Sequence, residues 1–208
     1  TSMPTILQMP LGPLQRNCYL LGCDETLEFA IIDPSWNGRS LYATANEQGF
    51  TITHILLTHS HFDHVGGLAE LKKETNAPIY IHPEAVAMLN EAFLQAAAWQ
   101  IRIPPPPPAD TMLTPGQTIH IGNLKLDVRY TPGHAPGHVS FYLPEHSVIF
   151  DGDVLFNQSI GRTDFPGGDL NVLLKSIREE LLSLPDETAV LSGHGPATTI
   201  GQEKATNP

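Results

Sequence analysis

Hydrophobic and polar residues follow two spacings along this chain, one typical of strands and one typical of helices. Short apolar runs rich in β-branched and aliphatic residues predict strands. They cover Ile6–Met9, Cys18–Gly22, Phe29–Asp33, Thr51–Thr58, Pro78–His82, Gln117–His120, Lys125–Thr131, Val139–Leu143, Val148–Asp151 and Thr188–Ser192. Longer segments with one apolar side predict helices at Asn37–Gln48, Asp63–Thr75, Pro83–Ile101 and Leu170–Leu184, and a last helix near Ile200. Because each half of the chain places strands before helices, we expect two sheets packed face to face with helices outside.

No segment between these elements is flexible enough to separate two domains, so we expect residues 3–208 to form one domain. The five consecutive prolines of Pro104–Pro108 predict an extended segment close to polyproline II. This segment is either a stiff connector between a helix and the next sheet or a rigid wall beside an active site. Thr1 and Ser2, which precede Met3, are interpreted as a remnant of cloning and are left out of the fold prediction.

Composition changes this picture mainly by excluding partners. The chain has 208 residues, of which 41% are hydrophobic, so it can bury a core. Its net charge of −11 disfavours nucleic-acid phosphates and anionic membranes as partners. No apolar run approaches the roughly 20 residues of a membrane span, and no signal peptide is recognised, so we predict a cytoplasmic protein. Cys18 and Cys23 make no disulfide framework, which suits a reducing compartment, and we expect both to be ordinary buried or half-buried thiols.

The segment Thr58–His64 carries three imidazoles and a carboxylate directly after an apolar strand. His59 and His61 are two residues apart, so both side chains can point to one side of an extended segment. Asp63 and His64 follow where a helix is predicted to begin, and there they can serve a second ion. Imidazole nitrogens and carboxylate oxygens are typical ligands of zinc and similar divalent ions.

Three more candidate ligands, His134, Asp153 and His194, each follow a predicted strand and sit beside glycine. One such residue alone would be an ordinary loop residue. Because strand ends meet at one rim of a sheet, ligands that are distant in sequence can converge there. Together they predict a two-metal hydrolase. His138 either orients a ligand or packs nearby, and we expect no role in the site for the other four histidines, His54, His82, His120 and His146.

Thr58–His64, Gly133-His134, Gly152-Asp153 and Gly193-His194 resemble, in this order, the metal motifs of the metallo-β-lactamase superfamily. The resemblance implies an α/β fold, a four-layer αββα sandwich of two mixed sheets with a binuclear metal site at one edge. By this resemblance His59, His61 and His134 hold the first metal; Asp63, His64 and His194 hold the second; and Asp153 bridges both. Two zinc ions are favoured, although iron or manganese would accept the same ligands.

Two further segments, residues 161–169 and 193–204, resemble those of short glyoxalase II-like hydrolases. The chain ends soon after His194, so we expect no C-terminal helical domain of the kind that supplies much of the glutathione site in two-domain glyoxalase II. The resemblance implies hydrolysis of a small acyl thioester, possibly glutathione-linked, by a hydroxide that bridges the two metals and is oriented by Asp63. It also implies that Arg162 grips a substrate carboxylate, although Arg162 could instead pair with Asp164.

Other functions remain open from the sequence. Persulfide dioxygenases also look like glyoxalase II and also carry a Gly-Arg-Thr-Asp-Phe segment, as residues 161–165 do here, but they work with one iron. A lactonase, a β-lactamase or a metal-binding scaffold without activity are further alternatives. The predicted helix Pro83–Ile101, with Phe93 and Trp99, could line the substrate pocket. The sequence does not fix the acyl group or the oligomeric state.

Overall fold

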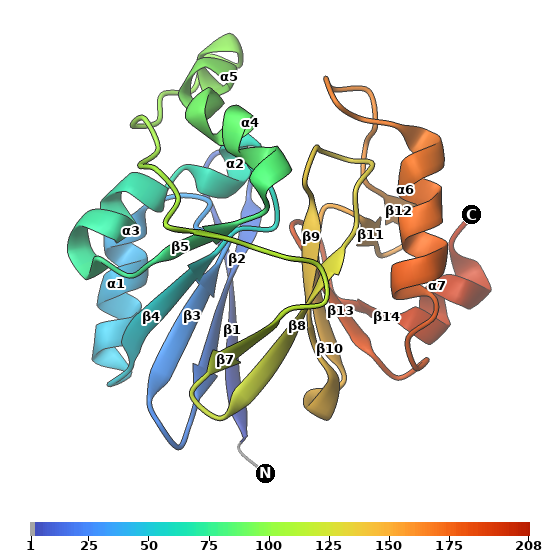
Figure 1. Ribbon diagram of the computed structural model, residues 1–208, viewed down its shortest axis with the longest axis horizontal. Coiled ribbons are helices and arrows are strands. Elements are labelled where there is room, and N and C mark those ends of the chain that lie inside the picture. The colour runs from blue at the N-terminus through green and yellow to red at the C-terminus, as the bar shows by residue number, and fades with distance from the viewer. Residues whose placement is uncertain (1–2) are drawn as a thin grey trace.

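The computed structural model of the chain describes residues 3–208, so the predicted remnant Thr1-Ser2 lies outside the described residues. Two six-stranded sheets pack face to face (Figure 1). The first sheet contains, in spatial order, β1 (Pro4–Leu11), β2 (Arg16–Cys23), β3 (Glu28–Ile32), β4 (Thr51–Leu56), β5 (Ile79–Ile81) and β6 (Thr111–Met112). The second contains β14 (Thr198–Thr199), β13 (Ala189–Ser192), β10 (Val148–Gly152), β9 (Val139–Leu143), β8 (Leu124–Tyr130) and β7 (Thr118–Ile121). Both sheets mix parallel and antiparallel pairs, as predicted.

Helices cover the two outer faces (Figure 1). On the side of the first sheet lie α1 (Gly38–Glu47), α3 (Leu68–Thr75), α4 (Val86–Asn90) and α5 (Ala92–Ala98). The second sheet is covered by α6 (Leu170–Ser176) and α7 (Ile200–Thr206), while the short α2 (Phe62–Val65) follows β4 at the rim. The predicted αββα sandwich is therefore confirmed.

The central strands are buried on both faces, and β2 shows how alternate residues enter two different cores. Cys18 and Leu20 point into the core between the first sheet and its helices. Tyr19 and Leu21 point the other way, into the core between the two sheets. Because both faces are covered, such a strand is a continuous apolar run without hydrophobic–polar alternation. Cys18 and Cys23 are both buried free thiols, as expected.

Three predicted helices are interrupted. The predicted helix Asp63–Thr75 is split into α2 and α3, because Gly66 and Gly67 lie against the backbone of residues 35–38: a Cβ on Gly66 would lie 2.4 Å from the Ser35 carbonyl oxygen. The predicted helix Pro83–Ile101 is divided into a 3-10 turn (Pro83–Ala85), α4 and α5, and it ends at Ala98 because Gln100 has a φ of 60°.

Beyond α6 the predicted helix Leu170–Leu184 continues as a π-helix over Ile177–Leu181, where Leu182 N donates to the carbonyl of Ile177, five residues back. Another 3-10 turn covers Pro144–His146. The short strands β6 and β14 and the small hairpin of β11 (Leu155–Phe156) and β12 (Ser159–Ile160) were not predicted, since two residues carry no periodicity.

The carboxyl ends of β4, β8, β10 and β13 open at the same rim of the sandwich (Figure 1). This is the arrangement that brings the predicted ligand loops together. The proline run Pro104–Pro108 connects α5 to β6 and supplies none of the residues that line the pocket at this rim, so it acts as a connector. Within residues 3–208, no helix has the length and apolar character needed to cross a membrane.

Candidate functional site

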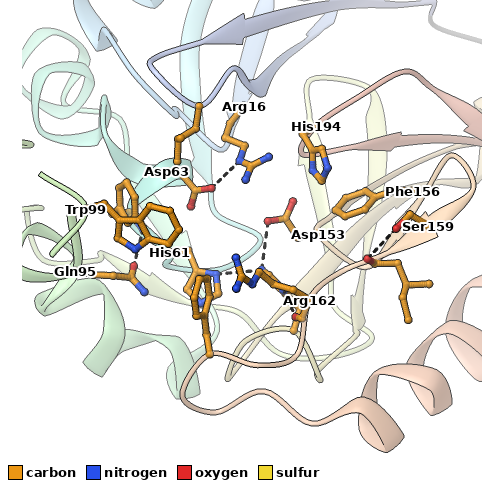
Figure 2. A pocket seen from close by; sticks show the side chains of 15 residues that line it. Arg16, His61, Asp63, Gln95, Trp99, Asp153, Phe156, Ser159, Arg162 and His194 are labelled. Carbon is orange, nitrogen blue, oxygen red and sulfur yellow. Dashed lines mark hydrogen bonds and ion pairs between the residues drawn. The ribbon is translucent and has the colours of Figure 1, made fainter. Parts of the chain in front are cut away.

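A pocket of about 390 Å³ lies at this rim (Figure 2). Its walls come from both halves of the sandwich and join aromatic, acidic, basic and imidazole side chains. The lining residues are Leu14, Arg16, His61, Phe62, Asp63, Gln95, Trp99, His134, Asp153, Phe156, Ser159, Ile160, Arg162, Phe165 and His194.

The loop after β4 is held by a buried carboxylate from the neighbouring strand. Asp33, directly after β3, has a φ of 53°, a left-handed conformation that Asp tolerates better than most residues. This sharp turn aims its carboxylate at Thr58, whose backbone N–H and hydroxyl donate to Asp33 Oδ1 and Oδ2 at 2.8 and 2.6 Å. The carbonyl of Thr58 accepts from Val139 N of the second sheet at 2.8 Å. The first residue of the ligand segment is therefore tied to both sheets.

Three imidazoles use Nδ1 for a contact with the protein, which turns Nε2 toward the Asp153 carboxylate. His59 Nδ1 lies 2.9 Å from Thr58 Oγ1, and His64 Nδ1 lies 3.1 Å from Asp33 Oδ2. His134 Nδ1 donates to the backbone carbonyl of Arg162 at 2.7 Å. Thr58 donates its hydroxyl proton to Asp33, so its oxygen accepts from His59. For His59 and His134 this places the ring proton on Nδ1 and leaves the lone pair on Nε2, which is the form that binds a metal. His64 faces a carboxylate at each nitrogen, so it would have to lose its Nε2 proton to bind a metal.

Asp153 lies at the centre of these rings. Its Oδ2 lies 2.9 Å from His64 Nε2, 3.3 Å from His134 Nε2 and 3.6 Å from His59 Nε2. His61 joins them, with its Nδ1 3.0 Å from His134 Nε2. Two groups at this rim have ligand atoms close enough to share an ion: His59, His61 and His134, and Asp63, His64 and Asp153. Asp33, His59 and His64 form a third such group, but the Asp33 oxygens are already engaged by Thr58 and His64.

The pKa values of this cluster reflect burial and close packing. Burial, with neighbouring imidazoles, holds the pKa of His59 well below its usual range and that of His61 at about 4, the largest neighbour effect on His61 coming from His134. Burial opposes the charges on Asp153 and His64, yet their attraction dominates. This attraction raises the pKa of His64 and lowers the pKa of Asp153. His134 also lowers the pKa of Asp153. The cluster therefore holds a charged carboxylate among mostly neutral imidazoles.

Several buried polar atoms here have no hydrogen-bond partner within residues 3–208. They include His59 Nε2, His61 Nε2, Asp153 Oδ1 and His194 Nδ1. Buried polar atoms without partners are costly and uncommon in folded proteins. Lone pairs of imidazole and carboxylate gathered in one place are the donor set of a divalent cation, so the residues present fit a metal site.

His194 lines the same pocket from the loop after β13, but it is outside the close ligand groups found among the described residues. Its ring packs edge-on against Phe156, with ring centroids 4.1 Å apart. Gly193 before it leaves room for the cluster, since a Cβ there would lie 2.3 Å from Asp153 Oδ1.

The loop that carries His194 is fixed from the first sheet by Asn17. The buried Asn17 amide donates to the carbonyls of Ser192 and Gly195 at 3.0 and 3.1 Å, and its backbone N–H donates to Gly193 at 2.7 Å. The Tyr19 hydroxyl also donates to the Ser192 carbonyl at 2.7 Å. Side chains of β2 thus hold both ends of a loop that begins after a strand of the other sheet.

Arg162 reaches the pocket, but its guanidinium is engaged. Nε and Nη2 donate to the two oxygens of Asp164 at 2.6 and 2.7 Å, and the group lies over the ring of Phe165, 3.9 Å from its centroid. The pairing with Asp164 that the sequence left open is therefore formed. The backbone carbonyl of Arg162 also fixes His134, as described above.

Sequence reasoning missed Arg16, Asp33 and Asn17. A carboxylate directly after a buried strand was a usable signal for Asp33, whereas nothing local marks Arg16 or Asn17. His138, left open, does both things considered: its Nε2 accepts from the backbone N–H of Asp153 at 3.2 Å, and its ring stacks on that of His59 at 4.7 Å.

Comparison with known proteins shows which family the chain belongs to. The family model described as the metallo-beta-lactamase superfamily matches residues 11–194. The chain is 41% identical to a probable metallo-hydrolase, YqgX, of Bacillus subtilis, covering 97% of this chain and 95% of the relative. It is 38% identical to the hydroxyacylglutathione hydrolase GloC of Haemophilus influenzae, covering 96% and 95%.

Solved structures agree. The BLEG-1 B3 metallo-beta-lactamase is similar with a TM-score of 0.92 and 43% identity over 98% of both chains. TTHA1623 in a di-iron-bound form is similar with a TM-score of 0.90 and 44% identity, covering 97% of this chain and 98% of that one. The buried His and Asp cluster at the rim of an αββα sandwich, together with these matches, shows that the chain belongs to the metallo-β-lactamase superfamily, as a metallo-hydrolase.

Proposed function

We propose that the protein hydrolyses an acyl thioester, with glutathione as the carrier, using two divalent metal ions at this rim. The observation that carries the proposal is the Asp153 carboxylate, whose Oδ2 lies within 3.6 Å of three imidazoles from two different loops. The 38% identity to a hydroxyacylglutathione hydrolase over nearly the whole chain supports the choice of substrate class.

In this proposal His59, His61 and His134 hold one ion, and Asp63, His64 and His194 hold the other, with Asp153 between them. Divalent ions bound there would polarise the substrate carbonyl and lower the pKa of water toward neutrality. Zinc is the ion we propose. The likeness to a di-iron structure keeps iron as the principal rival.

Asp63 is the proposed catalytic carboxylate. Its Oδ2 accepts from Arg16 Nε at 2.7 Å, which fixes the orientation of the carboxylate and leaves Oδ1 to hold the proton of the attacking water. The leaving thiolate needs no strong acid, because thiols ionise at a pKa of about 8.5. The proposal therefore needs no catalytic side chain beyond the proposed metal ligands and Arg16, which contacts Asp63.

We propose that the part of the substrate away from the reacting bond binds against the apolar wall of the pocket. Phe62 of α2, Trp99 after α5 and Phe165 form a connected aromatic group: Trp99 lies 6.2 Å from each of the other two rings. Predicted contact of Arg162 with a substrate carboxylate would require its pair with Asp164 to open. The cytoplasmic location remains a prediction.

A β-lactamase is the second candidate, because the 43% identity to a B3 metallo-beta-lactamase is higher than the 38% identity to the hydroxyacylglutathione hydrolase. Both reactions transfer an acyl group to water, so the metal cluster suits either. The two functions are distinguished by which substrate the protein hydrolyses.

The first test is turnover of S-D-lactoylglutathione by metal-replete protein, beside a chelated sample and a sample given the cephalosporin nitrocefin. We expect thioester hydrolysis that is lost on chelation and restored by zinc, with little nitrocefin turnover. Nitrocefin hydrolysis without thioester hydrolysis would contradict the proposed substrate and support the lactamase.

Asp33→Asn should weaken metal binding by about 10- to 100-fold, because it removes the carboxylate that orients His64 and, through Thr58, His59. Asn keeps the size of the side chain and tolerates the same backbone conformation. Competition with a chromogenic chelator measures the affinity. Asp110→Asn is the matched control. Like Asp33, Asp110 accepts a hydrogen bond from a backbone N–H, that of Ile79, but it does not line the pocket. Equal metal affinity in both variants would refute the role of Asp33.

Trp99→Ala should raise KM by up to about tenfold with little change in kcat, because Trp99 lines the pocket through aromatic contacts. Phe93→Ala is the comparison: Phe93 lies on α5, the helix that ends just before Trp99, but it packs against the helix-side core and lines a separate hollow. The sequence suggested that both side chains could line the pocket; Trp99 lines it and Phe93 does not, so we propose the effect on KM for Trp99 alone. Steady-state kinetics of the two variants decide, and an unchanged KM for Trp99→Ala would remove this wall from the substrate site.

A further inference from the structure

Arg16 is a basic group in direct contact with the proposed catalytic carboxylate, and most of its hydrogen-bonding capacity is unused. It is the first residue of β2, lines the pocket, and has a side chain that is 25% exposed. Its Nε donates to Asp63 Oδ2, and within residues 3–208 neither Nη atom has a hydrogen-bond partner. Figure 2 shows the guanidinium between Asp63 and His194, inside the pocket.

Arg162 offers much less. Its side chain is 49% exposed, and the two nitrogens that would make a bidentate contact already bind both oxygens of Asp164. Stacking on Phe165 holds the group further in place. A substrate carboxylate would have to displace Asp164 there, exchanging one carboxylate for another, so little binding free energy would be gained.

The charges of the pocket point the same way. The chain is strongly acidic, with a net charge of −11, so an anionic substrate gains nothing from the overall field. Asp63 and Asp153 are proposed metal ligands, and their charge would be shared with the cations. The charge of Arg16 is then only partly compensated by Asp63, in a pocket that the apolar side chains of Leu14 and Phe156 also line. In a partly desolvated site, such a guanidinium favours a carboxylate.

We propose that Arg16, not Arg162, is the anchor for a carboxylate of the substrate, and that the Arg162 side chain stiffens the loop of residues 161–169. The proposal rests on the proposed function, since it presumes that an acyl compound is bound at this metal site. Because Arg16 is fixed to Asp63, the carboxylate lies next to the reacting centre. The carboxylate belongs either to the acyl group or to the thiol carrier.

The experiment compares Arg16→Gln, Arg16→Lys and Arg162→Gln with the wild-type protein on two matched pairs of thioesters. S-D-lactoylglutathione and its dimethyl ester differ only in carrier carboxylates. The succinyl and butyryl thioesters of N-acetylcysteamine differ in a carboxylate on the acyl group. Isothermal titration with S-hexylglutathione and its dimethyl ester measures binding without turnover, and elemental analysis counts the metals in each variant.

We expect Arg16→Gln to raise KM for the charged member of one pair by about 10- to 100-fold, the range of a charged hydrogen bond, while KM for the neutral member and the metal content stay unchanged. The kcat should fall alike for both members, because Asp63 loses the hydrogen bond from Arg16 Nε. Arg16→Lys should lose less. Arg162→Gln should change KM by no more than about threefold, as expected for an exposed ion pair. The pair that responds shows which half of the substrate carries the carboxylate.

The proposal is overturned if Arg162→Gln causes the larger rise in KM, if Arg16→Gln raises KM equally for charged and neutral substrates, or if it lowers the metal content, since Arg16 would then only support Asp63. If the wild-type protein hydrolyses no thioester, the proposed function fails, and the titrations still decide the inference. The two N-acetylcysteamine thioesters, which then bind without turnover, are titrated as well. Weaker binding of either charged compound by Arg16→Gln, with no change for its neutral partner, supports the inference; equal binding of both charged compounds by wild type and variant, or no binding, overturns it.

Discussion

The buried carboxylate of Asp33 is the constraint on which the site depends. One side chain accepts from the backbone and the hydroxyl of Thr58 and contacts His64 Nδ1. Through the Thr58 hydroxyl it also fixes His59. A buried carboxylate is stable only when its oxygens are well paired, so each partner is held by the cost of leaving the charge unpaired. Asp33 therefore converts an irregular loop after β4 into a rigid frame for imidazoles that compose both proposed metal sites.

The remaining ligands are brought to this frame by contacts between the two sheets. Val139 N donates to the Thr58 carbonyl, and Asn17 spans the loop around His194. Each contact joins a residue of one sheet to a ligand loop of the other. The rigid position of the cluster thus follows from the sandwich as a whole, and loosening the contact between the sheets would widen the site before it unfolded the protein.

The sequence predicted the fold and the histidine and aspartate cluster well, because both depend on local patterns. Apolar runs predicted the long strands, and Thr58–His64 concentrates its ligands in seven residues. Long-range partners left no such pattern. Asn17 contacts residues about 175 positions away, and Arg16 meets Asp63 across 47 positions. The interruption of the predicted helix Asp63–Thr75 at Gly66-Gly67 was missed for the same reason. It is caused by the backbone of residues 35–38, which packs against these glycines.

Anomalous diffraction from crystals of zinc-loaded protein, measured on either side of the zinc absorption edge, tests the central claim most directly. The account predicts two anomalous peaks in the pocket, one among His59, His61 and His134 and one among Asp63, His64 and His194, with Asp153 reaching both. A single peak, or a second peak that excludes His194, would contradict the binuclear site.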